Sequence, residues 1–120
     1  MDRQTKISDS EKTLLLLKEI EKNPQITQRD LSRKLEMSLG KINFLIRSLI
    51  AKGIVEIKNF KNSKNKLAYI YLLTPHGLKI KIELTHSFFT WKIEEYAKLK
   101  EEIELLKKEV NLIPTEKELA

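Results

Sequence analysis

This sequence of 120 residues contains no cysteine and no long apolar run. Without cysteine, neither a disulfide nor a thiolate metal site can stabilise the fold, which is typical of a reducing compartment. The longest aliphatic run, Leu14 to Leu17, is far shorter than the roughly 20 residues of a membrane span. No basic segment followed by an apolar core stands at the N-terminus. We therefore expect a cytoplasmic protein with no membrane partner.

Residue types for catalysis or metal binding are equally scarce. The two histidines, His76 and His86, are accompanied by no cysteine and no nearby carboxylate pair, so we interpret both as structural or solvated. The sequence has no glycine-rich phosphate loop and no nucleophile motif. We predict no enzymatic activity, no catalytic residue, no metal site and no cofactor.

The net charge of +6 arises in one part of the chain. Between Ser38 and Lys66 lie seven basic residues and one acidic residue, Glu56, whereas the remaining 16 basic and 16 acidic residues cancel. Because a basic excess alone is common, it indicates a polyanionic partner only if the fold gathers these residues on one surface.

The first half of the chain has the pattern of three helices. Ser8 to Glu11 has capping-box spacing, and the helix that follows is stopped by Pro24. Thr27 caps a short second helix, and Ser38 caps a third helix that ends at Gly53. The apolar positions at helical spacing are Leu14, Leu17 and Ile20; Leu31 and Leu35; and Ile42, Leu45, Ile46, Leu49 and Ile50.

The pattern then becomes that of two strands. Residues 54–58 alternate between apolar and charged, residues 61–66 are wholly polar, and residues 67–73 are rich in strand-forming types. A hairpin with a basic tip is therefore predicted.

Thr74 caps a further helix with Pro75 at its first position, and nothing interrupts this helix before Pro114. At about 1.5 Å per residue it would extend roughly 50 Å, too long to pack along so small a domain. The expected fold class is mainly α with a small β-hairpin (α+β). We assign residues 8–74 to a winged helix-turn-helix domain, 75–113 to a C-terminal dimerisation coiled-coil helix, and 1–7 and 114–120 to flexible tails.

Two short helices joined by a tight turn and followed by a basic hairpin are typical of double-stranded DNA binding, in which the last helix enters the major groove. The side of the third helix away from its buried stripe supplies the candidates for base reading: Gly40, Lys41, Asn43, Phe44 and Arg47. Arg47 suits guanine, Asn43 suits adenine, and Phe44 suits a thymine methyl, each contact discriminating by about 1–3 kcal/mol. Gly40 would let the backbone approach DNA closely.

Phosphate contacts are expected from the helix N-termini and from the wing. Free N–H groups at a helix N-terminus bind anions, and lysines at a hairpin tip add charge. The phosphate candidates are Thr27, Gln28, Ser38, Lys61, Asn62, Ser63, Lys64 and Lys66. Three alternatives stay open: the wing lysines as a solvated turn, Gly40 as a frayed helix end, and Phe44 in a secondary core under the wing.

The long helix has a heptad pattern at alternating spacings of three and four. Its seam residues, which we expect at a dimer interface, are Phe89, Tyr96, Leu99, Ile103, Leu106 and Val110, interrupted by Lys92. Ile103 and Val110 at a positions with leucine at d positions favour a coiled coil of two parallel helices. Glu95 and Glu102 at g face Lys100 and Lys107 at e only in a parallel pair, so a parallel homodimer is predicted. The alternative is a helix folded back on its own domain.

Two other function classes stay open. The winged helix could bind another protein, with the coiled coil as the functional part, or it could bind RNA, for which Phe44 and Phe60 are the stacking candidates. A small-molecule effector is left unknown. Aromatic residues that could line a pocket for one are Tyr69, Tyr71, Phe88 and Trp91.

The order of these elements, with Leu73-Thr74-Pro75-His76-Gly77 after the wing, resembles the MarR family of winged-helix regulators. Three strings more narrowly resemble its exopolysaccharide-associated branch: residues 38–44 (SLGKINF), 59–66 (NFKNSKNK) and 71–75 (YLLTP). The resemblance spans about Thr13 to Val110. It implies a homodimeric bacterial transcription factor. The parallel helix pair predicts a palindromic or pseudo-palindromic operator, and DNA binding predicts a nucleoid-associated location.

The chain also departs from the broad family. Typical members carry Asp-x-Arg in the wing and dimerise through both terminal helices, whereas here the wing reads Asn62-Ser63-Lys64-Asn65-Lys66 and the N-terminus is short. Wing contacts and dimer geometry therefore cannot be transferred from the family. A repressor is favoured over an activator, because a steric block at a promoter needs no further surface.

Overall fold

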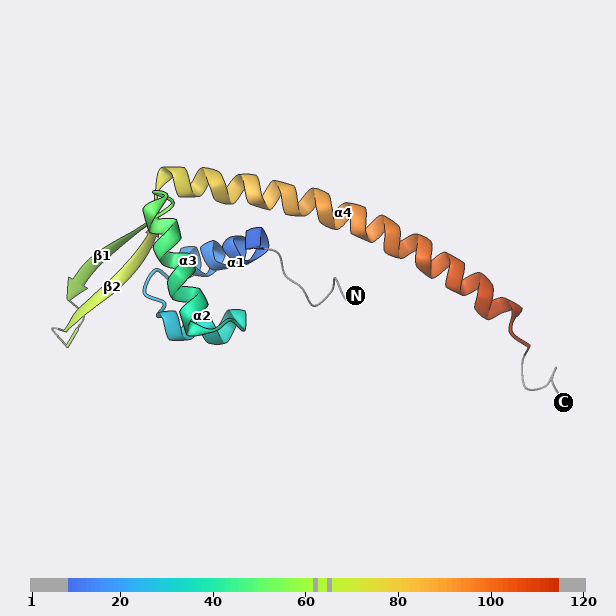
Figure 1. Ribbon diagram of the computed structural model, residues 1–120, viewed down its shortest axis with the longest axis horizontal. Helices are drawn as coiled ribbons and strands as arrows, with labels where there is room; N and C mark the ends of the chain where they lie inside the picture. Colours follow the sequence, from blue (N-terminus) through green and yellow to red (C-terminus); the bar gives the residue numbers. More distant parts are fainter. Residues whose placement is uncertain (1–8, 62, 65, 115–120) are drawn as a thin grey trace. The chain divides into compact units, whose positions relative to one another are not determined.

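The computed structural model describes residues 9–61, 63–64 and 66–114. Along these residues the chain forms α1 (Asp9–Lys22), α2 (Gln28–Leu35), α3 (Leu39–Ala51), β1 (Val55–Lys61), β2 (Leu67–Leu73) and α4 (Pro75–Leu112), as Figure 1 shows. The predicted fold class, mainly α with a hairpin and a long C-terminal helix, is confirmed. Ser8 and the expected tails, apart from Pro114, lie outside the described residues.

Both caps predicted for the helix-turn-helix are present. The Thr27 hydroxyl accepts a hydrogen bond from the backbone N–H of Asp30 (3.0 Å), and the Ser38 hydroxyl accepts one from that of Lys41 (3.1 Å). Each satisfies one of the N–H groups that a helix N-terminus leaves without a partner. The two capping residues therefore fix where α2 and α3 begin.

The turn between α2 and α3 depends on a left-handed residue that is not glycine. Glu36 has a φ of 53°, and its backbone N–H bonds to the carbonyl of Ser32 at the end of α2. The Ser32 hydroxyl donates to the carbonyl of Met37. These contacts turn the chain within three residues, so that α3 starts directly after α2.

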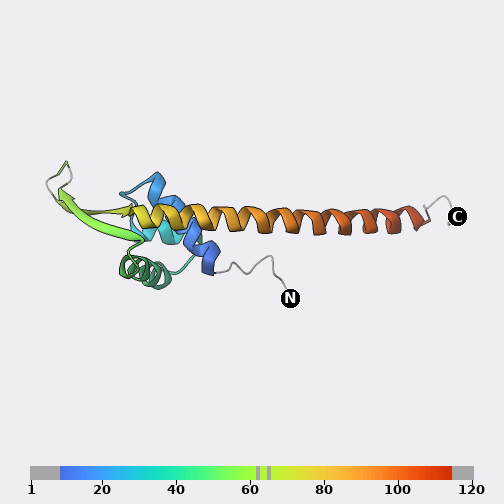
Figure 2. The same cartoon turned by 90° about the horizontal axis from the view of Figure 1, so that it is seen from above.

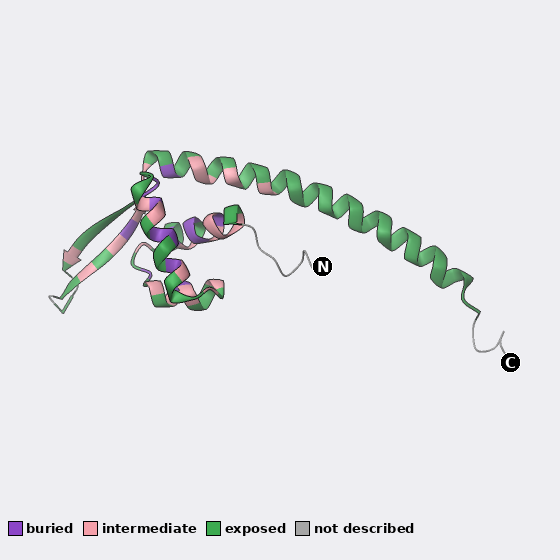
Figure 3. Cartoon of the chain, viewed as in Figure 1, coloured by how far each residue is buried: buried purple, intermediate pink, exposed green. Residues whose placement is uncertain are grey.

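The core lies between the three short helices and the base of the hairpin, where Figure 3 shows the buried residues gathered. Its fully buried side chains are Leu16, Leu17, Ile20, Leu31, Ile42, Ile46 and Val55. Ile80 and Leu84 of α4 pack against this core, and the compact unit continues to His86, beyond the domain end expected at Thr74. We call its described residues, from Asp9 to His86, the winged unit.

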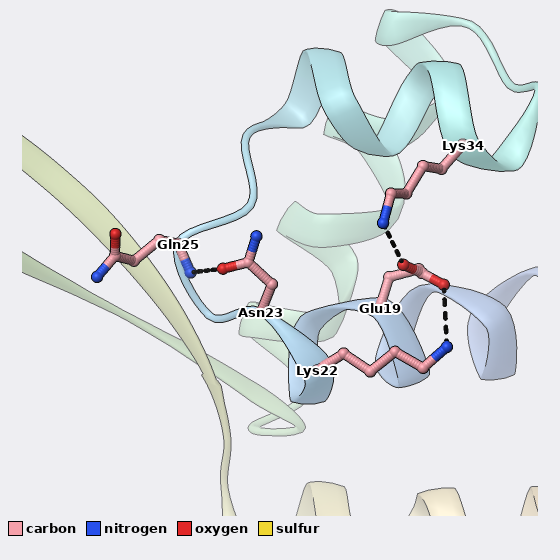
Figure 4. Close-up of polar contacts among 5 residues, drawn as sticks. All are labelled: Glu19, Lys22, Asn23, Gln25 and Lys34. Carbon is pink, nitrogen blue, oxygen red and sulfur yellow. Dashed lines mark hydrogen bonds and ion pairs between the residues drawn. The ribbon is translucent and has the colours of Figure 1, made fainter.

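Polar contacts join α1 to α2 at the surface of this unit (Figure 4). The Glu19 carboxylate lies between the ammonium groups of Lys34, at 3.3 Å, and Lys22, at 3.8 Å. The Asn23 side-chain oxygen accepts a hydrogen bond from the backbone N–H of Gln25 (3.1 Å). Surface ion pairs contribute only about 0–1 kcal/mol each, so these contacts orient the helices more than they stabilise them.

The hairpin is an antiparallel pair in which Val55 faces Leu73 and Lys61 faces Leu67. The Tyr71 backbone N–H bonds to the carbonyl of Pro24 (2.9 Å), so β2 is also attached to the loop before α2. Tyr71, one of the aromatic residues considered for an effector pocket, is buried in the core.

Thr74 and Gly77, between the end of β2 and the first turn of α4, lie against Gly53 and Ile54, the two residues before β1. The Thr74 hydroxyl donates to the carbonyl of Gly53 and accepts from the backbone N–H of Gly77, which caps α4. A Cβ on Gly77 would lie 2.0 Å from the carbonyl oxygen of Ile54. Glycine is therefore needed at this position because only a residue without a side chain lets α4 approach β1 so closely.

Residues 87–114 form a second compact unit, and we call its helical part, residues 87–112, the distal helix. Both views show α4 as an unbroken helix (Figures 1 and 2). From Phe89 to Pro114 every residue is exposed. Among the described helices, none combines the length and apolar character that crossing a membrane requires.

Candidate nucleic-acid interface

The outer face of α3 presents most of the predicted base-reading residues to solvent. Gly40, Asn43, Phe44 and Arg47 are exposed, and Lys41 is half-buried. The Phe44 side chain is 63% exposed, so the alternative that placed it in a secondary core under the wing is wrong. Because the opposite face of α3 is buried in the core, these side chains are held on a rigid helix.

Lys41 and Phe44 lie one helical turn apart and interact. The Lys41 ammonium is 5.6 Å from the centroid of the Phe44 ring and 3.8 Å from a carboxylate oxygen of Asp9 in α1. The first contact has cation–π geometry. Lys41 is thus held over the phenyl ring rather than extended fully outward, and the spacing of three residues on a helix could have indicated this contact.

Gly40 has no structural reason to be glycine within the described residues. A Cβ at this position would meet nothing within 4 Å, in contrast to Gly77. Near the N-terminus of α3, alanine would therefore fit in the free protein. This open space is compatible with close approach of a ligand to the backbone.

Gln28, at the first position of α2, bridges α3 and the hairpin. The Asn43 side-chain nitrogen donates to the Gln28 side-chain oxygen (3.3 Å), and the Gln28 side-chain nitrogen donates to the Tyr71 hydroxyl (3.2 Å). Sequence reasoning placed Gln28 among phosphate contacts and missed both bonds. They join positions 15 and 43 residues apart, for which the sequence carries no local signal.

The remaining phosphate candidates lie at helix N-termini and on the hairpin. Thr27 and Ser38 are exposed at the starts of α2 and α3. Lys61, Ser63, Lys64 and Lys66 are exposed at or near the hairpin tip, and Asn62 lies outside the described residues. Lys58, farther down β1, is 3.5 Å from the carboxylate of Glu56. Positive charge therefore gathers toward the tip of the hairpin.

The predicted dimer residues are all exposed along the distal helix. Their exposed fractions are 65% for Phe89, 64% for Tyr96, 52% for Leu99, 52% for Ile103, 58% for Leu106 and 62% for Val110. Lys92, which interrupts the seam, lies with its ammonium 4.7 Å from the centroid of the Trp91 ring and 3.9 Å from the Glu95 carboxylate. These apolar side chains are exposed within the single chain, as a surface that a partner covers would be.

Residues 9–56 match a family model described as winged helix-turn-helix DNA-binding. No curated protein sequence gives a significant match. A solved structure of a PadR-like transcriptional regulator from Bacillus cereus is similar at 20% identity and a TM-score of 0.65, covering 72% of this chain and 89% of that one.

Two further solved structures cover more of this chain. MepR from Staphylococcus aureus, solved in complex with DNA, has 22% identity and a TM-score of 0.60 over 92% of this chain and 78% of that one. PcaV from Streptomyces coelicolor, a transcriptional regulator solved with its natural ligand, has 12% identity and a TM-score of 0.60 over 90% and 77%.

Residues 9–56 therefore match a winged helix-turn-helix DNA-binding model, and the chain shares the fold of MarR-like and PadR-like transcriptional regulators. Neither the family model nor these structures points to the exopolysaccharide-associated branch.

Proposed function

We propose that this protein is a sequence-specific, double-stranded DNA-binding transcriptional regulator that acts as a homodimeric repressor. The observation that carries the proposal is the outer face of α3, which presents Asn43, Phe44 and Arg47 from a helix whose other face is buried in the core. A helix of this kind, followed by a basic hairpin, fits the major groove while the hairpin lies along the backbone. The fold shared with a regulator solved in complex with DNA supports the same reading.

Sequence reading is assigned to three side chains of α3. The Arg47 guanidinium donates two parallel hydrogen bonds to a guanine, the Asn43 amide pairs with an adenine, and Phe44 contacts a thymine methyl, each worth about 1–3 kcal/mol of discrimination. Lys41, held over the Phe44 ring, adds positive charge beside it. Gly40 keeps the start of α3 narrow enough for the backbone to approach the duplex.

Positioning on the phosphates is assigned to the helix N-termini at Thr27 and Ser38 and to the hairpin lysines. Backbone N–H groups and lysines bind phosphate without regard to base, so they set affinity and register but not sequence preference. This set comprises Thr27, Gln28, Ser38, Lys61, Asn62, Ser63, Lys64 and Lys66.

Dimerisation is assigned to the distal helix. Its seam is exposed in the single chain, and a second copy of the same helix would cover it with matching a and d residues. A parallel pair also sets Phe88 at g against Ile93 at e, an apolar pair in line with Glu95–Lys100 and Glu102–Lys107. Two-fold symmetry then gives two recognition helices and a palindromic or pseudo-palindromic operator.

Repression follows from occupancy of a promoter by this dimer, which needs no additional surface for polymerase. The resemblance of residues 38–44, 59–66 and 71–75 to the exopolysaccharide-associated branch makes exopolysaccharide genes the predicted target. Transcript levels in a strain that lacks the gene test this, since a repressor's target transcripts rise in its absence.

The test of DNA reading is a fluorescence anisotropy titration of the full chain against duplexes from its own upstream genomic region, beside an unrelated duplex, at two salt concentrations. We expect one duplex to bind in steps of two chains. With about six phosphate contacts, affinity should fall about 1,000-fold between roughly 50 mM and 200 mM salt. Weak, sequence-independent binding at low salt would contradict the proposal for this region.

A variant with Arg47, Lys64 and Lys66 changed to Ala separates DNA binding from protein binding. DNA affinity should collapse because both a base contact and phosphate contacts are removed, while dimerisation through the distal helix should persist in analytical ultracentrifugation. If DNA affinity is unchanged, the winged unit serves another partner. Tighter binding to RNA hairpins than to duplex DNA would support the RNA alternative instead.

A further inference from the structure

The hydrogen bonds around Gln28 extend the proposed base reading, and this inference rests on that proposed function. Asn43 is exposed on α3, yet its amide is not isolated, because its nitrogen donates to the Gln28 side-chain oxygen at 3.3 Å. Gln28 in turn donates to the Tyr71 hydroxyl at 3.2 Å. The three side chains belong to α3, α2 and β2, so the link crosses the helix-turn-helix and reaches the wing.

The far end of this link is fixed. Tyr71 is 6% exposed, and its backbone N–H bonds to the Pro24 carbonyl at 2.9 Å. Its hydroxyl thus has a defined place in the core, and Gln28, which is half-buried, spans from that place to the surface. The Gln28 amide uses both of its polar atoms within the chain, which a residue held only for phosphate contact would not need.

The geometry points to Gln28 as a positioning residue that holds the Asn43 amide in the orientation for reading adenine. An asparagine side chain that lacks a partner rotates about its Cβ–Cγ bond, and this rotation exchanges the positions of the amide oxygen and nitrogen. When one Asn43 N–H is bonded to Gln28, the amide oxygen and the second N–H remain available side by side. This donor and acceptor pair complements the N7 acceptor and the N6 amino donor of adenine. Tyr71 acts through Gln28, so a buried wing residue contributes to sequence preference without touching DNA.

The experiment starts by selecting duplexes from a randomised pool with the unaltered full chain, followed by anisotropy titrations with every single base-pair substitution in the selected site. The variant Asn43→Ala identifies the base pair that Asn43 reads. We expect Gln28→Ala to lower discrimination at that same base pair by about 2- to 10-fold, as the loss of one or two hydrogen bonds implies. Tyr71→Phe should give a smaller loss, about 2-fold, at the same base pair.

The matched control is Gln25→Ala. Gln25 is an exposed glutamine in the loop before α2, and it contributes its backbone N–H, not its side chain, to the bond with Asn23 (Figure 4). This variant should leave discrimination at every base pair unchanged. The free protein gives a second readout: the Asn43 side-chain amide should become more mobile by ¹⁵N relaxation in Gln28→Ala and in Tyr71→Phe, but not in Gln25→Ala.

Three outcomes are distinguishable. Relaxed preference at the Asn43 base pair in both Gln28→Ala and Tyr71→Phe supports the inference. A uniform loss of affinity for all duplexes in Gln28→Ala with the preference at the Asn43 base pair unchanged, or an unchanged Asn43 amide and preference in Tyr71→Phe, overturns it and leaves the proposed function intact. Failure of the unaltered chain to enrich any duplex overturns the proposed function, and the inference with it.

Discussion

The winged unit and the distal helix differ in how far their apolar side chains are buried. In the winged unit, Leu16, Leu17 and Ile20 of α1 are fully buried, and Thr27 and Ser38 cap α2 and α3. In the distal helix, leucine, isoleucine and valine side chains at seam positions are more than half exposed. Roughly 25 cal/mol is gained for each Å² of apolar surface removed from water, and only the first region gains this within a single chain.

Because of this difference in burial, we expect the stability of the two regions to depend differently on protein concentration. The winged unit has its own core and should unfold at the same denaturant concentration whatever the dilution. In the proposed dimer the distal helix would gain apolar burial from a second copy, so its order should increase with concentration. The following substitutions are chosen to affect one region while leaving the other as a reference.

The largest effect is expected from Leu106→Lys in the distal helix. Placing a lysine at a d position in both copies should weaken the dimer by about 4 kcal/mol, roughly 1,000-fold, because two leucines lose their burial. Sedimentation equilibrium measures this directly. Leu105→Lys is the matched control: the two leucines are 60% and 58% exposed in the single chain, but Leu105 lies off the seam. Equal weakening by both variants would contradict the predicted heptad.

The next effect concerns the winged unit. Gly77→Ala places a Cβ 2.0 Å from the carbonyl oxygen of Ile54, which requires the backbone to move, so we expect about 3 kcal/mol of destabilisation by urea unfolding. Gly40→Ala, whose Cβ has open space, should instead stabilise the free protein by about 0.5–1 kcal/mol and weaken DNA binding. Equal stability of the two variants would argue against the close approach of α4 to β1.

A charge exchange tests the orientation of the helix pair. Glu95→Lys with Glu102→Lys should weaken the parallel homodimer by about 2 kcal/mol, because four e–g pairs are lost and like charges meet. Mixing this variant with Lys100→Glu and Lys107→Glu should restore a heterodimer, which native mass spectrometry can detect. An antiparallel pair would set g against g and e against e, so like charges would meet in both proteins; if the first variant dimerises as well as the unaltered chain, the parallel orientation is contradicted.

The smallest effect is expected at Glu36, the left-handed residue between α2 and α3. Glu36→Gly should raise the free energy of unfolding of the winged unit by about 0.5 kcal/mol, since glycine adopts a positive φ without strain but loses more entropy on folding. Urea unfolding measures the change, and dimerisation serves as the internal control. A loss of stability would show that the Glu36 side chain contributes more than its backbone strain costs.

Much of the fold could be predicted because its signals are local. Thr27, Ser38 and Thr74 each precede a helix and cap it, and the hairpin was predicted from the alternation of residues 54–58, the polar residues 61–66 and the strand-forming residues 67–73. The exposed face of α3 could be predicted from its buried stripe. Lys41 is the exception, because it is half-buried and its ammonium lies over the Phe44 ring. The assignment of individual residues to bases, phosphates and the dimer remains a prediction.

What escaped prediction is non-local or lacks a residue-type signal. Glutamate is not the residue expected at a positive φ, so nothing marked Glu36. The need for glycine at 77 comes from Ile54, which is distant in sequence. The contacts of Gln28 with Asn43 and Tyr71 likewise depend on tertiary packing that no spacing rule supplies.

The clamp formed by Thr74 at the feet of the hairpin has a consequence for protein engineering. Its hydroxyl and backbone N–H hold the carbonyls of Gly53 and Ile54, so both ends of the wing stay together whatever lies between them. Each doubling of a loop's length adds only about 0.6 kcal/mol of closure entropy. Because Val55 and Tyr71 at the base of the hairpin belong to the core, only the tip can be exchanged, and longer, shorter or differently charged tips should be accepted without a change in the rest of the fold.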